Sequence, residues 1–189
     1  MEEYNMKKFI CTGLILFFVF FSGCLWYQVT EYIIHYSDDL NSGTITVRYN
    51  NIMSSEKEQT KQKDDFNELL KMLNEDGFLL DQMKEGIYVQ ERRLVEENGR
   101  LNAYYKGIFR NLTIDDEQSS IQNNERIIIL SNKDKEKIES NGKVIKSEEN
   151  TILTWPKEQR DIYIKVTSTE TDTLYPLIDF YREGKKVKE

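Results

Sequence analysis

Hydrophobic and polar residues alternate strictly over residues 44–50 (TITVRYN). A period of two is typical of a strand that buries one face. Residues 29–36 (VTEYIIHY) are rich in β-branched and aromatic residues, which strands favour. Between these segments, residues 38–43 (DDLNSG) form a cluster of turn residues. We therefore expect an antiparallel hairpin over residues 29–50.

The next part of the chain shows the spacing of apolar residues that is typical of a helix. Apolar residues spaced i, i+3, i+4 and i+7 fall on one face of a helix, and this spacing joins Phe66, Leu69, Leu70 and Leu73. Ser55 and Glu58 fit a capping box, in which each side chain accepts a hydrogen bond from a free N–H of the first turn. Gly77 is expected to end the helix. The apolar stripe should lie on the sheet.

The dipeptide Asn98-Gly99 separates two strand-like segments, residues 87–95 and 101–109. Asn-Gly readily adopts the positive φ angles of a type I′ turn, so a hairpin is expected. A two-residue turn sets the cross-strand pairs Glu91–Lys106, Arg92–Tyr105 and Tyr88–Phe109. The first pair is favourable because the charges are opposite. This register places polar and apolar side chains on the same face of the hairpin. A longer turn with a shifted register therefore remains an alternative.

Further strands are expected in the second half of the chain, at residues 127–130, 151–155 and 161–166. The first of these is a short apolar run suited to a central strand. Asn141-Gly142 predicts a second hairpin, between residues 135–139 and 143–147.

Residues 174–181 are expected to form a short helix near the end of the chain. Strands outnumber helices and their links are short. The fold class is therefore expected to be α+β, a mainly antiparallel β-sheet of hairpins with one amphipathic helix packed on one face.

The first 24 residues follow another pattern. Lys7 and Lys8 precede an apolar run over residues 9–21, and small residues come next. A cationic start, an apolar stretch and small residues are typical of a secretory signal. We expect a signal peptide at residues 1–23 and a single extracytoplasmic domain at residues 24–189. Either Met1 or Met6 fits as the first residue.

The segment Phe21-Ser22-Gly23-Cys24 resembles the lipobox of bacterial lipoprotein precursors, with Phe21 where leucine is usual. The resemblance covers about the first 24 residues. It implies a lipid, such as a palmitate chain, on the Cys24 thiol and cleavage before Cys24. A membrane lipid bound through Cys24 is then the first partner of the protein.

Two alternatives for this end stay open. Residues 9–30 carry no charge, and such a stretch is long enough to span a bilayer as an uncleaved helix. Trp26 and Tyr27 would then lie where interfacial aromatic residues are common. The second alternative is an ordinary cleaved signal that releases the protein.

Composition narrows the function. The chain has 189 residues with a net charge of −7, and 12% are aromatic, more than disordered chains carry. An acidic domain is repelled by phosphate backbones, so no nucleic-acid partner is expected. The two cysteines are Cys11, inside the signal, and Cys24. We therefore expect no disulfide, no cysteine-based metal site and no cofactor.

Three acidic groups could carry chemistry: Asp38-Asp39, Asp64-Asp65 and Asp115-Asp116-Glu117. Paired carboxylates hydrolyse glycosides when they face each other across a cleft, and carboxylate oxygens also bind Ca²⁺. Charged residues are usually solvated, so turns and a helix flank are the simpler interpretation. His35, the only histidine, lies in a predicted strand, where a structural role is favoured over catalysis. Tyr104-Tyr105 and Trp155-Pro156 form either a binding platform or strand core.

These patterns favour a membrane-anchored envelope lipoprotein with a non-enzymatic binding or assembly role and an envelope protein as partner. We expect it at the cell envelope, facing the periplasm or the exterior, with no catalytic residue. One alternative is a carboxylate-dependent hydrolase acting on an envelope polymer through Asp115, Asp116 or Glu117. Another is a lipid-tethered inhibitor or immunity protein.

Overall fold

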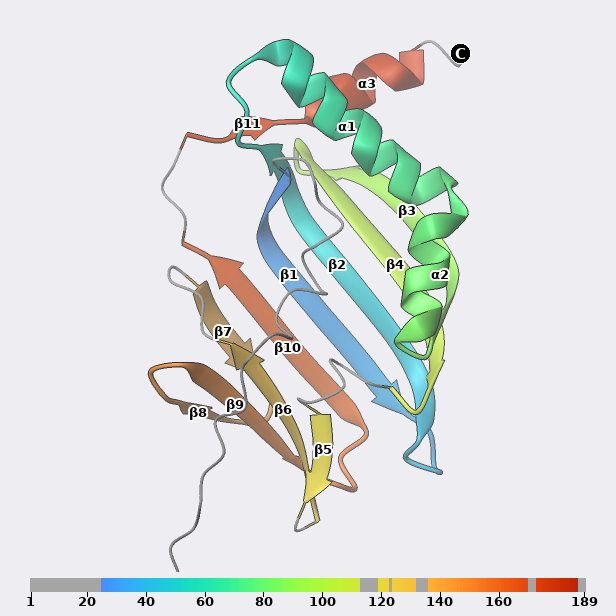
Figure 1. The fold of residues 1–189 in the computed structure, drawn as a ribbon, viewed down its shortest axis with the longest axis vertical. Coiled ribbons are helices and arrows are strands. Elements are labelled where there is room, and N and C mark those ends of the chain that lie inside the picture. The colour runs from blue at the N-terminus through green and yellow to red at the C-terminus, as the bar shows by residue number, and fades with distance from the viewer. Residues whose placement is uncertain (1–24, 113–118, 123, 132–135, 170–172, 187–189) are drawn as a thin grey trace, which may run out of the picture.

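The computed structural model describes residues 25–112, 119–122, 124–131, 136–169 and 173–186. These residues form two antiparallel sheets and three helices (Figure 1). The α+β class, mainly antiparallel sheet, is confirmed. The division of the strands between two sheets was not expected.

The large sheet contains, in spatial order, β3 (Ile87–Glu97), β4 (Arg100–Arg110), β2 (Ser42–Ser54), β1 (Leu25–Tyr36), β10 (Asp161–Ser168) and β7 (Glu136–Ser140). The short strand β11 (Tyr175–Pro176) pairs with the end of β2. The small sheet has the order β5 (Ser119–Gln122), β6 (Glu125–Ser131), β9 (Asn150–Pro156) and β8 (Lys143–Lys146). The run at residues 127–130 therefore lies in a central strand, as expected.

Two apolar cores lie on the same face of the large sheet. The first core joins the large sheet to the small sheet and includes Val47, Tyr105, Leu153 and Trp155. The second joins the large sheet to α1 (Gln59–Asn74) and α3 (Ile178–Lys186) and includes Leu101 and Phe66. Leu101 and Tyr105 point to the same side of β4 because side chains alternate along a strand. Tyr49 of β2 packs against both cores.

A backbone irregularity in β2 keeps that strand on both cores. Asn51 has a positive φ of 57°. Buried side chains alternate normally at Ile45 and Val47, and the alternation then shifts by one residue to Ile52 and Ser54. One strand therefore supplies buried residues to the small sheet at one end and to the helices at the other.

The two early hairpins are confirmed. β1 and β2 pair from Leu25–Ser54 to Tyr36–Gly43. β3 and β4 turn through Asn98 and Gly99, with φ angles of 53° and 73°. The predicted pairs Glu91–Lys106 and Arg92–Tyr105 are present.

The predicted pair Tyr88–Phe109 is wrong. A β-bulge between Val89 and Glu91 shifts the register, so that Tyr88 lies opposite Ile108. The turn keeps two residues, and the longer turn is excluded. The change of register comes from one extra residue within the strand.

The second Asn-Gly hairpin is wrong. β7 pairs with β10 in the large sheet, and β8 pairs with β9 in the small sheet. Asn141 and Gly142 are thus the point where the chain passes from one sheet to the other. A Cβ atom on Gly142 would lie 2.4 Å from the Nε1 atom of Trp155, so only glycine lets the two sheets approach here.

The helical region differs from its prediction at both ends. α1 begins at Gln59, and its N-cap residue Glu58 makes no side-chain cap, so the predicted capping box is absent. Gly77 does not end the helix. Instead Glu75 adopts extended angles of −98° and 155°, α1 stops at Asn74, and α2 (Asp76–Lys84) follows at once.

The apolar stripe of α1 is confirmed, since Phe66 and Leu69 are buried against the large sheet. The expected C-terminal helix forms further along the chain than predicted, at α3. No helix in the described part of the chain is long and apolar enough to cross a membrane. Residues 25–30 of the alternative span lie in β1, and residues 9–24 lie outside the described residues.

Candidate functional site

A pocket of about 310 Å³ lies between α1, α2 and the large sheet. The sheet contributes Tyr27 of β1, Tyr49 of β2 and Tyr105 of β4, and the helices contribute Leu69, Met72 and Phe78. Ligand pockets typically measure ~300–1,000 Å³ and are mainly apolar with a few polar groups. This pocket is at the small end of that range.

Two aromatic pairs build the walls. The rings of Tyr27 and Tyr49 lie 4.8 Å apart at an angle of 41°. The rings of Phe78 and Tyr105 meet edge to face at 5.3 Å, an arrangement that aromatic rings favour. The Tyr105 hydroxyl donates a hydrogen bond of 2.9 Å to Oε1 of Gln82 on α2. The sheet and α2 are thus joined across the pocket by both apolar and polar contacts.

The tyrosines of the pocket remain neutral at ordinary pH. Burial raises the pKa of the Tyr27 hydroxyl well above its usual range, and the nearby Tyr49 adds to the shift. Burial alone raises the pKa of Tyr49. Burial, followed by the charges of neighbouring tyrosines and Glu85, raises the pKa of Tyr105. The aromatic part of the wall therefore offers rings and uncharged hydroxyl groups.

Two lysines at the pocket each pair with a carboxylate of the same helix. The Lys71 ammonium lies 2.6 Å from the Glu68 carboxylate on α1. The Lys84 ammonium lies 2.7 Å from the Asp81 carboxylate on α2. Hydrogen bonding to Glu68 raises the pKa of Lys71. These four side chains neutralise one another in pairs.

Arg92 of β3 holds the junction between α1 and α2. Its Nη1 atom donates hydrogen bonds of 2.8 Å to the carbonyl oxygens of Met72 and Glu75. The last carbonyls of a helix lack partners within the helix, so a guanidinium there satisfies groups that would otherwise be unpaired. Arg92 thereby fixes the angle between the helices and the shape of the pocket.

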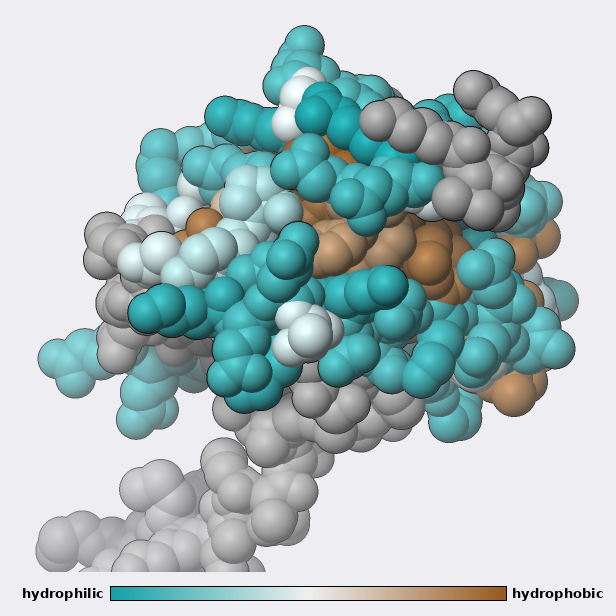
Figure 2. All heavy atoms as spheres, turned by 90° about the horizontal axis from the view of Figure 1, so that it is seen from above, coloured by the Kyte–Doolittle hydropathy of each residue, from teal (hydrophilic) through white to brown (hydrophobic). Residues whose placement is uncertain are grey.

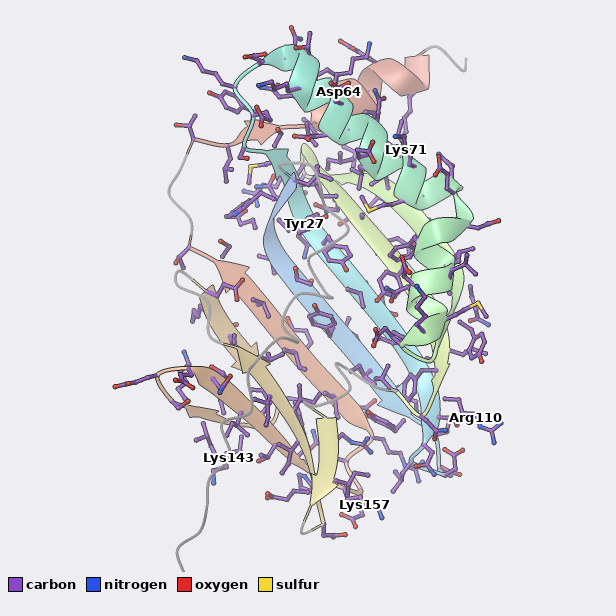
Figure 3. All side chains as sticks on the ribbon, in the orientation of Figure 1. Tyr27, Asp64, Lys71, Arg110, Lys143 and Lys157 are labelled. Atoms are coloured by element: carbon purple, nitrogen blue, oxygen red, sulfur yellow. The ribbon has the colours of Figure 1, made fainter. Side chains whose placement is uncertain are left out.

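The pocket lies toward the end of the large sheet where β1 begins. Leu25 pairs with Ser54, and Ser54 also pairs with Tyr175 of β11, which precedes α3. Tyr27 and Lys71 lie in this part of the molecule, whereas Arg110 and Lys157 lie toward the other end (Figure 3). Seen from the end that carries α1 and α3, apolar surface gathers in the middle and polar side chains border it (Figure 2).

The two described acidic doublets lie at opposite ends of β2. In the β1–β2 turn, Asp38 pairs with Arg160, and Asp39 accepts hydrogen bonds from the backbone of Asn41 and Ser42. Those bonds, that of Ser42 first, lower the pKa of Asp39. Both residues therefore serve the turn.

At the other end of β2, the Asp65 carboxylate is buried and accepts a hydrogen bond of 2.5 Å from Ser54, while Asp64 is exposed. These doublets do not converge on one site. Asp115, Asp116, Glu117 and the lipobox residue Cys24 lie outside the described residues.

His35 lies on the face of the large sheet opposite the cores. Its Nδ1 atom is 2.6 Å from the Asp161 carboxylate of the neighbouring strand, and both side chains are exposed. Ile33, Tyr88 and Ile108 are also exposed on this face. Within the described ranges, no group of three or more histidine, cysteine or acidic side chains is placed to hold a metal ion.

Of the two interpretations of the aromatic residues, a binding platform or strand core, strand core holds for Trp155, whereas Tyr105 is buried and also lines the pocket. Trp155 is fully buried in the first core, and Tyr105 is buried against α2. Tyr104 is half-buried, donates a hydrogen bond of 2.7 Å to Glu91 and lies beneath the Arg93 guanidinium at 4.4 Å. Its contacts are those of a cross-strand pair.

Sequence reasoning did not find the pocket. No sequence pattern marked Phe78, Gln82 or Arg92 as residues of a pocket. Tyr49 was expected only as part of a half-buried strand. Comparison with protein-family models, curated proteins and solved structures finds no match for this chain.

Proposed function

We propose that this protein is a lipoprotein of the cell envelope, tethered by lipid on Cys24, whose folded part binds a ligand and performs no catalysis. The observation that carries the proposal is the place of the pocket. β1 begins at Leu25, directly after Cys24, and Tyr27 already lines the pocket. Three extended residues span ~10 Å, so a lipid on Cys24 would hold the pocket close to the membrane surface.

Asp39 and Asp65, two candidates for a hydrolytic pair, have structural roles, whereas Asp115, Asp116 and Glu117 lie outside the described residues. Asp39 holds a turn through backbone hydrogen bonds, and Asp65 is bonded to buried Ser54. Glycoside hydrolysis needs two carboxyl groups about 5–9.5 Å apart on either side of a substrate. These two carboxylates are separated by the length of β2 and serve the fold.

Metabolic labelling with a clickable fatty acid tests the anchor. Cells producing the full chain, Cys24→Ala or Cys11→Ala are labelled, and the protein is recovered from the membrane fraction. We expect label on the wild type and on Cys11→Ala, and none on Cys24→Ala. Cys11→Ala is the matched control because it removes the other cysteine of the chain.

Two results would overturn the proposal. Membrane-bound protein without label in any variant would mean an uncleaved protein anchor. A shortened, unlabelled product in the medium would mean ordinary secretion.

A further inference from the structure

We propose that the pocket between α1, α2 and the large sheet takes a hydrocarbon segment of a lipid acyl chain. This inference rests on the proposed lipoprotein function, because the anchor would bring the pocket to the bilayer. It adds the chemical class of the ligand.

The wall of the pocket is mainly apolar. Leu69 and Met72 of α1 and Phe78 of α2 face Tyr27 and Tyr49 of the sheet. Rings and aliphatic side chains attract apolar groups because contact removes both surfaces from water. Methionine also adapts its shape to a flexible ligand.

Four polar side chains at the pocket already have partners within the protein. Lys71 and Lys84 are paired with carboxylates of their own helices. Gln82 accepts from Tyr105, and Arg92 donates to helix carbonyls. A charged ligand would have to compete with these contacts for the same polar groups. An uncharged apolar ligand leaves all of them in place.

The size and position of the pocket also suit an acyl chain. A volume of about 310 Å³ suits part of one chain, not a whole lipid. Tyr27 is three residues from Cys24, so both a neighbouring phospholipid and the chains on Cys24 itself are within reach. The two sources share one chemistry, the acyl chain.

Photo-crosslinking of the full chain in lipid nanodiscs tests the proposal. In one arm, two kinds of nanodisc are compared. The first contains a phospholipid with a diazirine in its acyl chain, and the second contains a phospholipid with the diazirine in its head group. In the other arm the cells are fed a diazirine fatty acid, and the purified protein is placed in unlabelled lipid. Crosslinked peptides are mapped by mass spectrometry.

We expect chain-labelled lipid to mark peptides around Met72 or Tyr49 in at least one arm, and head-group-labelled lipid to leave them unmarked. The first arm identifies a neighbouring lipid, and the second identifies the protein's own anchor. Crosslinks elsewhere in the protein without any in the pocket would overturn the inference. So would equal marking by the head-group probe.

Matched variants separate filling of the pocket from general damage. Ala103→Phe adds bulk to β4 at the pocket and is expected to lower pocket crosslinking about tenfold, because a filled pocket excludes the chain. Thr44→Phe adds a larger side chain on the exposed face of β2 and should change nothing. Tyr49→Phe removes only a hydroxyl group and should retain crosslinking. Loss of pocket crosslinking in Tyr49→Phe would show that the hydroxyl group recognises the ligand and would contradict an acyl chain.

Mass spectrometry of the same samples reports whether Cys24 is lipidated. Lipidation without pocket crosslinks leaves the anchor proposal standing and removes the ligand proposal. Pocket crosslinks without lipid on Cys24 support the ligand proposal and remove the anchor proposal.

Discussion

The indole N–H of Trp155 donates a hydrogen bond of 2.9 Å to the side-chain oxygen of Asn141. Trp155 lies in β9 of the small sheet, and Asn141 directly follows β7, the edge strand of the large sheet. The same oxygen accepts from the backbone N–H of Tyr163, and the Asn141 amide donates to the Asp161 carbonyl. One side chain therefore bonds both sheets where the chain crosses between them.

Replacing Asn141 with alanine should cost about 2 kcal/mol of unfolding free energy. The change removes all three hydrogen bonds and leaves the N–H of fully buried Trp155 without its acceptor. Urea unfolding of both proteins gives the difference. Asn74→Ala, which removes one bond to the Leu70 carbonyl at an exposed site, should cost less than ~0.5 kcal/mol. Equal losses would contradict a special role for Asn141.

Asp65→Ala should destabilise the protein by about 2 kcal/mol, while Asp64→Ala should change the unfolding free energy by less than ~0.5 kcal/mol. Asp65 and Ser54 are both buried and bonded to each other, and the Ser54 oxygen also accepts from the Glu56 N–H. Asp64 is the exposed neighbour. Chemical denaturation of the two single variants makes the comparison, and similar values for both would refute the buried pair.

Arg126→Met should increase the unfolding free energy by about 1 kcal/mol. Arg126 is buried with its guanidinium 3.5 Å over the Tyr36 ring, and its Nε and Nη2 atoms make no hydrogen bond within the described structure. An apolar side chain of similar length removes this desolvation cost, and we expect that gain to exceed the loss of the contacts that the guanidinium makes with the ring and hydroxyl of Tyr36. Arg110→Met, at an exposed position, should have no effect. A less stable Arg126→Met variant would show that the guanidinium is paired in solution.

Alkaline titration should ionise Tyr27, Tyr49 and Tyr105 only as the protein unfolds. Burial raises the pKa of each hydroxyl above the ordinary value of ~10, so only the unfolded chain ionises there at first. Their contribution to stability is complete below pH ~10 and is lost as pH rises further. Tyrosinate absorbance and circular dichroism, followed together, measure this. Full tyrosinate absorbance by pH ~12 in a protein that circular dichroism shows to be folded would contradict burial of these groups.

Local patterns predicted the fold well where one segment contains all the information. The alternation in residues 44–50 and the Asn98-Gly99 turn each specify a hairpin with its neighbour. Asn141-Gly142 has the same local signal but lies between strands of different sheets, and the pairing of β7 with β10 and of β8 with β9 decides the outcome. Long-range contacts override the turn signal.

The pocket could not be predicted for a related reason. Tyr27, Phe78 and Tyr105 come from three distant segments, and only the packing of α2 on the sheet brings them together. The break at Glu75 that separates α1 from α2 depends on Arg92, which caps α1 from a strand beyond both helices. Periodicity in a single helix does not contain that contact.

The intact mass of the protein purified from the membrane fraction tests the central proposal most directly. We expect a polypeptide that begins at Cys24 and carries additional mass from acyl chains, and the Cys24→Ala variant should lack that added mass. An unmodified chain that retains residues 1–23 would contradict the lipid anchor.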